Sequence, residues 1–306
     1  MNNAVVKLAL LFLLPLGFVK GQEIPNTLTL FTAQAQNTEY SRSGKNGVWF
    51  EVRMDTSNPC RYTEDNKIYQ ADREFTFEFH YFDPQGKERY MRHKKITKQG
   101  FCLTETGDTT ECTYEVSDFS FSDTFDDPDS CSNRYVLEVA CHHKIFSKDY
   151  DQTVEALCFL FADQRSRETS YSGIVENERN LWMHPMRSRL FRIVEINPFP
   201  YIQYPIKKGK TWKWRLSIGS QWGDERWKTW TGGIVNKYKY KITDTDCEVV
   251  TLMGTLSCVK VEAVAKSRIG KTYLTAYYND TYGFVKMDNT NIDGSRLLVD
   301  LVGTNF

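Results

Sequence analysis

The chain has 306 residues, and its 39 lysines and arginines equal its 39 aspartates and glutamates, so the formal net charge is zero. A composition that is 41% hydrophobic and 14% aromatic provides enough apolar material for one large β domain or two ordinary ones. After residue 21 no uncharged apolar run approaches the roughly 18 residues of a membrane-spanning helix, which excludes a helical membrane protein.

The charges are divided unevenly along the chain. Residues 1–164 contain 17 Lys and Arg against 25 Asp and Glu, a net charge of −8, and residues 165–306 contain 22 against 14, a net charge of +8. Opposite signs on the two halves predict two domains that attract one another. Because the lysines of the basic half alternate with tyrosines, we interpret them as a solvated face and expect no nucleic-acid partner.

The first 21 residues are typical of a secretory signal peptide. Lys7 precedes an apolar run from Leu8 to Val19, and the small residue Gly21 leads into polar sequence at Gln22. An apolar run of about a dozen residues is too short to cross a bilayer, which needs roughly 20, and an uncleaved N-terminal anchor is the alternative. We therefore expect a secreted protein, extracellular or periplasmic if the source is bacterial.

The eight cysteines are an even number, as expected for an exported protein whose thiols pair. A hairpin that turns at residues 252–253 would place Cys247 opposite Cys258, within the distance that a disulfide needs. Cys102 and Cys112 flank a glycine-containing turn, so we predict this second disulfide as well. The other four cysteines allow three pairings, of which we prefer Cys131–Cys141 with Cys60–Cys158. Their spacing does not predict structural zinc.

Alternating aromatic residues predict strands in the acidic half. The predicted strands span Glu74–Tyr81, the residues from Arg89 onward, Tyr135–Ala140 and Ala156–Phe161. We expect a disulfide-rich, β-sandwich-like domain over residues 22–164. The polar stretch 163–180 shows little periodicity, and we place the boundary to the second domain there.

The basic half predicts successive antiparallel strands with turns about every 8–12 residues, a pattern typical of a barrel or sandwich. The strand over Thr211–Ile218 places Trp212 and Trp214 on one side, where they would line the core. Further strands are predicted over Lys237–Ile242, Cys258–Ala265, Thr272–Tyr278, Tyr282–Met287 and Leu297–Val302. The fold class is therefore all-β, with an antiparallel, partly closed β-barrel-like domain over residues 165–306.

Three further tryptophans are candidates for ligand binding. Trp222 and Trp227 bracket a turn at residues 223–226, and Trp230 follows closely. Exposed indole rings at a sheet edge would form a stacking platform for sugar rings or for an apolar ligand. The alternative is that these tryptophans also pack in the core.

A run of four aspartates is a candidate calcium site, because Ca²⁺ takes about six to eight oxygen ligands. The run does not have the spacing of an EF-hand loop, and a solvated acidic loop is the alternative. Asn279 begins an N-glycosylation acceptor, Asn-Asp-Thr, at a predicted turn. The four aspartates are Asp123, Asp126, Asp127 and Asp129.

The sequence contains no motif that predicts catalysis, whether G-x-S-x-G, H-E-x-x-H, a phosphate-binding loop or a dinucleotide glycine pattern. His142 and His143 are adjacent, so on a strand they would point to opposite faces. Glu176 and Glu178 share one face of a strand, but this spacing is too common to indicate a site. We expect no cofactor.

The segment Val250–Val261, followed by Gly270–Thr272 and Tyr282–Lys286, resembles the DUF3108-like group of exported bacterial β-barrel proteins. Residues Glu176–Asn180, with the Trp-rich stretch, are similar to secreted Bacteroidetes proteins. The resemblance covers residues 165–306 and implies a curved antiparallel sheet that closes toward a barrel, with no assigned activity. The turn of the group commonly contains a proline where this chain has Leu252.

Aromatic residues without catalytic motifs favour a secreted, non-enzymatic binding or extracellular-matrix protein, whose ligand would be a glycan or an apolar molecule. The alternative is an extracellular hydrolase that acts on a polysaccharide or another polymer, with carboxylates that converge only in the fold.

Overall fold

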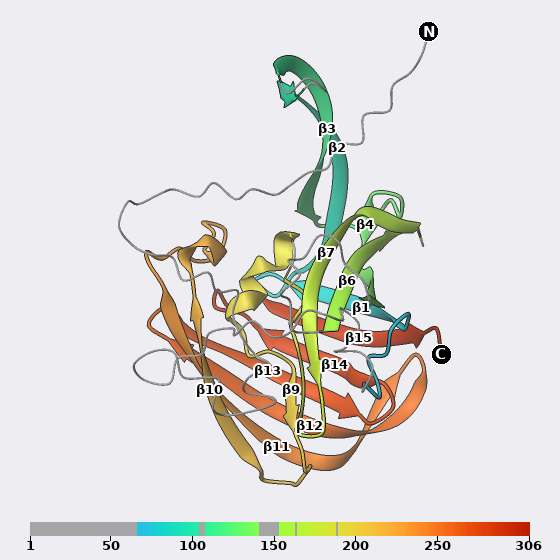
Figure 1. Cartoon of the computed structure of the whole chain (residues 1–306), viewed down its shortest axis with the longest axis vertical. Helices are drawn as coiled ribbons and strands as arrows, with labels where there is room; N and C mark the ends of the chain where they lie inside the picture. Colours follow the sequence, from blue (N-terminus) through green and yellow to red (C-terminus); the bar gives the residue numbers. More distant parts are fainter. Residues whose placement is uncertain (1–65, 104–107, 141–152, 163, 188) are drawn as a thin grey trace.

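The computed structural model describes residues 66–103, 108–140, 153–162, 164–187 and 189–306 (Figure 1). The predicted signal peptide at residues 1–21, Cys60 and Cys141 lie outside the described residues. In the part of the chain that the structure describes, no helix is long and apolar enough to cross a membrane.

The described residues form strands and two short 3-10 helices. The bounds, in chain order, are β1 (Glu74–Phe82), β2 (Glu88–Leu103), β3 (Thr109–Ser122), β4 (Cys131–Ser132), β5 (Arg134–Ala140), β6 (Thr153–Phe161), β7 (Gln164–Glu176), β8 (Asn180–Met183), η1 (Arg189–Ile196), β9 (Tyr201–Gln203), β10 (Thr211–Ile218), η2 (Ser220–Trp222), β11 (Ile234–Thr251), β12 (Gly254–Ser267), β13 (Gly270–Asn279), β14 (Gly283–Thr290) and β15 (Arg296–Thr304). The all-β fold class is confirmed.

The main sheet curls into a nearly closed antiparallel barrel (Figure 1). Its strand order is β10-β11-β12-β13-β14-β15-β1-β5-β6-β7-β8-β9. The two end strands meet through side chains, since the ring of Tyr201 on β9 packs edge-on against Trp212 on β10, with the ring centroids 5.5 Å apart. The basic half therefore does supply a barrel wall, as its turn pattern predicts.

The acidic half contributes to the same sheet. Strand β1 pairs with β15 from Phe75 to Phe82 and with β5 on its other edge. Residues 164 and 165 lie at the start of β7, which pairs with β6, so the sheet runs without a break across the expected domain boundary. A separate N-terminal sandwich is not confirmed, because β1, β5 and β6 are barrel strands.

The stretch expected to separate the domains is largely strand β7. Its residues are polar, but they are tied to β6 by a ladder from Thr153–Ile174 to Phe161–Gln164, with one irregularity between Cys158 and Leu160. Backbone pairing with an apolar neighbouring strand thus overrides the weak periodicity of this segment.

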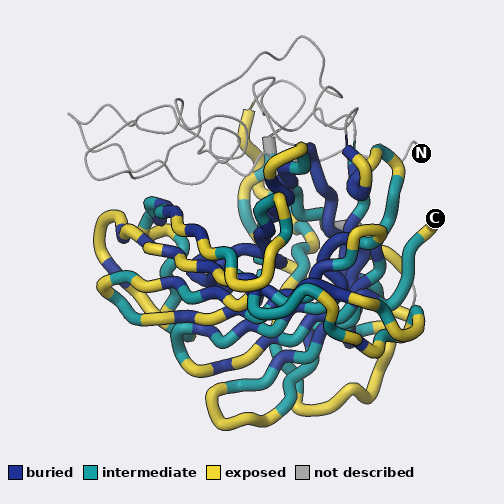
Figure 2. The backbone as a smooth tube through the Cα atoms, turned by 90° about the horizontal axis from the view of Figure 1, so that it is seen from below, coloured by how far each residue is buried: buried dark blue, intermediate teal, exposed yellow. Residues whose placement is uncertain are grey.

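Alternation along the strands separates the core from the surface. Figure 2 shows buried and exposed residues following one another along the barrel strands. On the inner face Trp214 stacks on Tyr238 with ring centroids 4.1 Å apart, and Trp212 stacks on Tyr240 at 5.2 Å. Both tryptophans are buried, which confirms the prediction that they line the core.

Strands β2 and β3 form a two-stranded arm that projects beyond the barrel (Figure 1). Cys102 and Cys112 close its outer end as a disulfide, with their Cα atoms 5.8 Å apart, which confirms that predicted pair. An isolated two-stranded hairpin is at best marginally stable in water, so the covalent link has a clear structural role here.

The other predicted disulfides are not formed among the described residues. Cys247 and Cys258 are directly opposed on β11 and β12, as the hairpin predicts, yet both are free thiols, and the Cys247 Sγ donates to the Cys258 carbonyl at 3.2 Å. The register is therefore confirmed and the bond remains a prediction. Cys131 and Cys158 are buried free thiols, and their expected partners lie outside the described residues.

Candidate functional site

The outer surface of β10–β13 carries a field of positive charge that we call the lysine face. Its origin is the strict alternation of these strands: in Lys237–Lys241 the tyrosines point into the core and the lysines point outward. Over residues 211–217, 235–241, 260–266 and 271–277 the sequence contains one acidic residue, Glu262. The outward cations are Lys213, Arg215, Lys237, Lys239, Lys241, Lys260, Lys266 and Lys271.

Strand register aligns four of these cations in one line across the sheet, the cation row. Arg215 on β10 lies opposite Lys237 on β11, which lies opposite Lys266 on β12, which in turn lies opposite Lys271 on β13. Neighbouring strands are about 4.8 Å apart, so the row places a positive charge at nearly every such step. A second like-charge pair, Lys213–Lys239, lies beside it.

This arrangement opposes folding. Like charges directly opposite one another on a sheet destabilise it by a few tenths to about 1 kcal/mol per pair. The spacing of about 4.8 Å between neighbouring strands is shorter than the Debye length, which is about 8 Å at physiological salt. Salt therefore screens the repulsion between opposed cations only in part. An anionic ligand with several charges would relieve this repulsion. A surface with a purely structural role gains nothing from a row of like charges.

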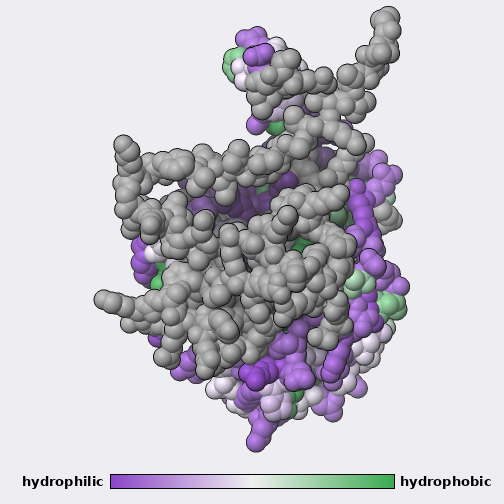
Figure 3. Space-filling model, in the orientation of Figure 1, coloured by the Kyte–Doolittle hydropathy of each residue, from purple (hydrophilic) through white to green (hydrophobic). Residues whose placement is uncertain are grey.

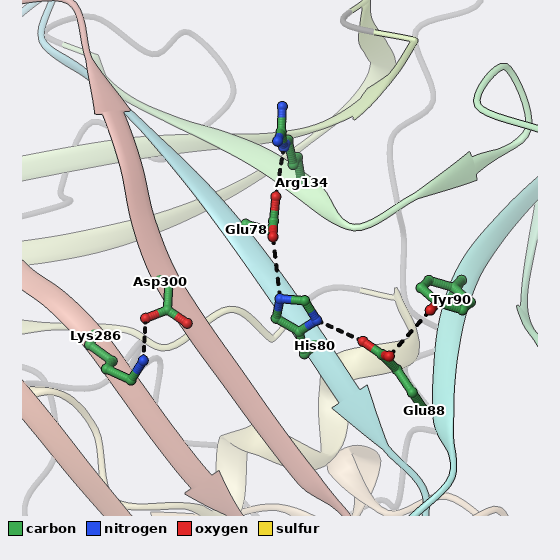
Figure 4. A network of polar contacts seen from close by, with 7 residues as sticks. All are labelled: Glu78, His80, Glu88, Tyr90, Arg134, Lys286 and Asp300. Carbon is green, nitrogen blue, oxygen red and sulfur yellow. Dashed lines mark hydrogen bonds and ion pairs between the residues drawn. The ribbon is translucent and has the colours of Figure 1, made fainter. Parts of the chain in front are cut away.

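Elsewhere on the barrel exterior, several directly opposed charges match (Figure 4). Lys286 lies opposite Asp300 at 2.7 Å, and Arg134 lies opposite Glu78 at 3.0 Å. The imidazole of His80 is also in contact with Glu78, at 3.3 Å. On the lysine face the matched pair is Lys260–Glu262 at 2.8 Å, which raises the pKa of Lys260.

A shallow groove opens at the β11–β12 end of the lysine face. Lys237, Lys266, Arg268 and Val235 are among its lining residues, and its empty space is about 970 Å³, including the part that is open to solvent. Tyr273 stands on the same face with 46% of its surface exposed. In Figure 3 the lower edge of the molecule, where β10–β12 lie in Figure 1, is mostly hydrophilic. The lysine face thus combines a cation-lined groove with an accessible aromatic ring outside it.

The structure places the predicted tryptophan platform differently from the expectation of exposed rings. Trp230 is buried, with 8% of its surface exposed, and lies 6.0 Å from the half-buried ring of Trp227. Trp222 is half-buried, and the guanidinium groups of Arg187 and Arg192 lie 5.3 and 5.6 Å from its ring centroid. Ligand binding by these three tryptophans remains a prediction.

The turn between Trp222 and Trp227 is held by its own ion pair. Arg226 donates to both carboxylate oxygens of Asp224 at 2.8 Å, and this hydrogen bonding lowers the pKa of Asp224 to about 2. The rings on either side are thereby fixed against the barrel end, which explains why they pack instead of projecting.

The carboxylates of the acidic run have partners within the protein. Asp123 pairs with Lys87 and Arg89, and Asp126 pairs with Arg92. Asp127 accepts from Ser130 and from backbone N–H groups of its own turn. Among the described residues, no group of three or more His, Cys, Asp or Glu side chains could hold a metal ion. Calcium binding by Asp123, Asp126, Asp127 and Asp129 remains a prediction.

Two other residues from the sequence analysis have structural partners. The carboxylate of Glu176 accepts hydrogen bonds from the backbone N–H groups of Lys67, Ile68 and Tyr69, so it anchors the segment that leads into β1. Asn279 ends β13 at the predicted turn, and its amide nitrogen donates to the Ser257 carbonyl at 2.9 Å. Glycosylation of Asn279 remains a prediction.

The sequence analysis missed the cation row, because alternation along one strand does not reveal what lies opposite on the next. The relevant signal was nevertheless present: lysine or arginine occurs at alternate positions in three successive strands, at Lys213 and Arg215, at Lys237 to Lys241, and at Lys266. When such strands are neighbours in an antiparallel sheet, their cations must share one face.

No protein-family model matches the chain, and no curated protein has a matching sequence. The resemblance to DUF3108-like proteins is therefore not confirmed. Among solved structures, a chain from Bacteroides fragilis, provisionally described as an exported protein with a YmcC-like fold, has a TM-score of 0.37 and 11% identity over 78% of this chain and 97% of that chain. A chain from Parabacteroides distasonis, provisionally described as a lipoprotein, has a TM-score of 0.36 and 9% identity over 79% and 100%.

Proposed function

We propose that this chain is a secreted, non-enzymatic protein that binds an acidic polysaccharide through the lysine face. The observation that carries the proposal is the cation row, in which Arg215, Lys237, Lys266 and Lys271 oppose one another across four strands. A linear polymer with an anionic group on each or every second sugar ring would meet these cations repeatedly. Each contact would replace a like-charge repulsion with an attraction.

Two further features favour a polysaccharide over other polyanions. The predicted signal peptide and the Cys102–Cys112 disulfide favour an oxidising compartment outside the cytoplasm, where acidic polysaccharides are abundant. The exposed ring of Tyr273 offers an apolar face that a sugar ring can cover. The rigid aromatic layer beneath the face keeps the cations at fixed spacing, which lowers the entropic cost of binding.

The test is binding of the mature chain to heparin (sulfated), polygalacturonate (carboxylated) and neutral dextran by calorimetry at several salt concentrations. We expect binding to at least one acidic polymer and none to dextran, with an affinity that falls steeply as salt rises. K237Q/K266Q removes two charges from the centre of the row and should weaken binding about tenfold.

The matched control is K94Q/K98Q, which removes the same charge from two exposed lysines of the arm. If both variants weaken binding equally, net charge and not the row determines affinity. If the wild-type chain binds neither acidic polymer, or binds a single-stranded oligonucleotide more tightly than both, the proposal is wrong.

A further inference from the structure

A small internal cavity has a wall composition unlike the rest of the barrel core. It lies between the inner faces of β5–β7 and the segment that connects β8 to η1. Three of the seven methionines of the chain line it, and three of its polar lining residues matter for the argument below. These six lining residues are Met183, Met186, Met287, Glu155, Ser172 and His184.

One buried atom of the polar wall, His184 Nδ1, has no hydrogen-bond partner among the described residues, whereas the Ser172 hydroxyl is a hydrogen-bond partner of the Glu155 carboxyl group. Glu155 is 3% exposed and Ser172 is 8% exposed, and the two lie directly opposite each other on β6 and β7. A buried polar atom without a partner costs about 1–3 kcal/mol. An unpartnered imidazole nitrogen on a wall that also carries thioether sulfurs indicates a site that is built to hold something.

Charge around the cavity favours a cation of charge +1. Arg187, at one end of the cavity, donates to the carboxylate of the buried Glu195 at 2.7 Å. The charges of Arg187 and Glu195 cancel each other. Among the described residues of the lining, Glu155 is then the one acidic residue whose charge is not balanced by this pair. A single positive charge in the cavity would neutralise its ionised form.

Size excludes most ligands. The enclosed part of the cavity has room for about one water molecule, so an organic cation does not fit, whereas one metal ion does. Calcium and magnesium prefer about six or more oxygen ligands, which this wall does not provide. Thioether sulfur is a soft ligand that favours Cu(I), and imidazole nitrogen also binds copper.

We propose that this cavity is a Cu(I) site, with the imidazole of His184 and the thioethers of Met186 and Met287 as ligands and with Glu155 balancing the charge. Met183 is left out of the ligand set because its sulfur already accepts a hydrogen bond from the Tyr69 hydroxyl at 3.7 Å. The site does not depend on the lysine face, which lies on the outer surface of the sheet.

The test is anaerobic competition for Cu(I) between the mature chain and bicinchoninate, followed by absorbance. The double variant M186L/M287L keeps side-chain volume and removes both sulfurs, so the fold should persist. We expect it to lose affinity at least about tenfold relative to the wild-type chain, as removal of metal-site residues typically does. H184Q should show a comparable loss.

The matched control is M91L, since Met91 is equally buried but lies on β2, away from the cavity. Free thiols also bind Cu(I), so all variants are compared with the same cysteines present. If M186L/M287L and M91L bind Cu(I) equally, or if the wild-type chain binds none, the cavity holds water and the proposal is wrong. Near-ultraviolet circular dichroism of each variant separates loss of the site from loss of the fold.

Discussion

At the scale of single residues, Glu155 makes the stability of the metal-free protein depend on pH. Burial raises the pKa of Glu155 to about 8. An exposed glutamate, as in the unfolded chain, has a pKa near 4.3. Between these two values the folded state holds a proton that the unfolded state has released. The groups around Glu155 are Arg187, Ser172, His184, Tyr69 and Tyr135.

Because the pKa is raised on folding, the contribution of Glu155 to stability is fully present below about pH 4.3 and is lost as pH rises toward 8. We expect the free energy of unfolding to fall by up to about 1.4 kcal/mol per pH unit within that window. E155Q cannot titrate, so its stability relative to the wild-type chain should increase from pH 5 to pH 8. Urea unfolding at several pH values, with a chelator present, measures the difference.

E225Q is the control for this prediction, because Glu225 is exposed in the turn between η2 and β11. Its stability curve should stay parallel to that of the wild-type chain. Parallel curves for E155Q as well would mean that Glu155 is accessible to water in solution and keeps an ordinary pKa.

At the scale of elements, strand assignment from the sequence succeeded where alternation is strong. The predicted strand at residues 211–218 matches β10, and the predicted hairpin places Cys247 opposite Cys258. Register away from the hairpin was not predictable in the same way. Irregular pairing between Ile242 and Cys247 shifts β11 against β12 by two residues, so Lys237 meets Lys266, whereas the hairpin register would have paired Lys239 with Lys266.

The cause is a pair of β-bulges, which insert residues into one strand without a sequence pattern that marks them. A shift of two residues keeps every side chain on its own face, so burial was still predicted correctly. What changed is which cations oppose one another. The lysine face was thus predictable as a face, but the cation row was not.

The arm gives a prediction at the same scale. Strands β2 and β3 pair with each other along their whole length, and near the outer end the disulfide Cys102–Cys112 limits their separation. In C102S/C112S we expect backbone amides of β3 near residue 112 to exchange at least about tenfold faster, because a disulfide typically contributes about 2–4 kcal/mol. Hydrogen exchange with mass spectrometry measures this.

Strand β13, in the barrel wall, is the internal reference for the same experiment, and its exchange should not change. Unchanged exchange in β3 would show that the ribbon is stable without its covalent link. Faster exchange in β13 as well would show that the arm and the barrel open together.

At the scale of the whole molecule, strands from the two oppositely charged halves pair in one sheet. Strand β1 pairs with β15, and β15 belongs to the basic half. Aromatic packing also crosses the division, since Phe79 and Tyr81 contact Phe191 with ring centroids 5.1 and 6.1 Å apart. The charge asymmetry therefore reflects two surfaces of one barrel, and composition alone could not distinguish this from two separate domains.

This continuity predicts that residues 165–306 do not fold when they are expressed alone. The fragment lacks β1, β5 and β6, so it would leave the edge of β15 unpaired and uncover Leu297, Val299 and Leu301, which are buried in the whole chain. Exposed apolar edges of this kind cause aggregation. We expect the fragment to be insoluble or to give a poorly dispersed NMR spectrum, whereas the chain from residue 22 unfolds in one calorimetric transition. A soluble fragment with a dispersed spectrum, or two separate transitions in the longer chain, would show that the basic half is a domain in its own right and that its pairing with β1 adds only an interface.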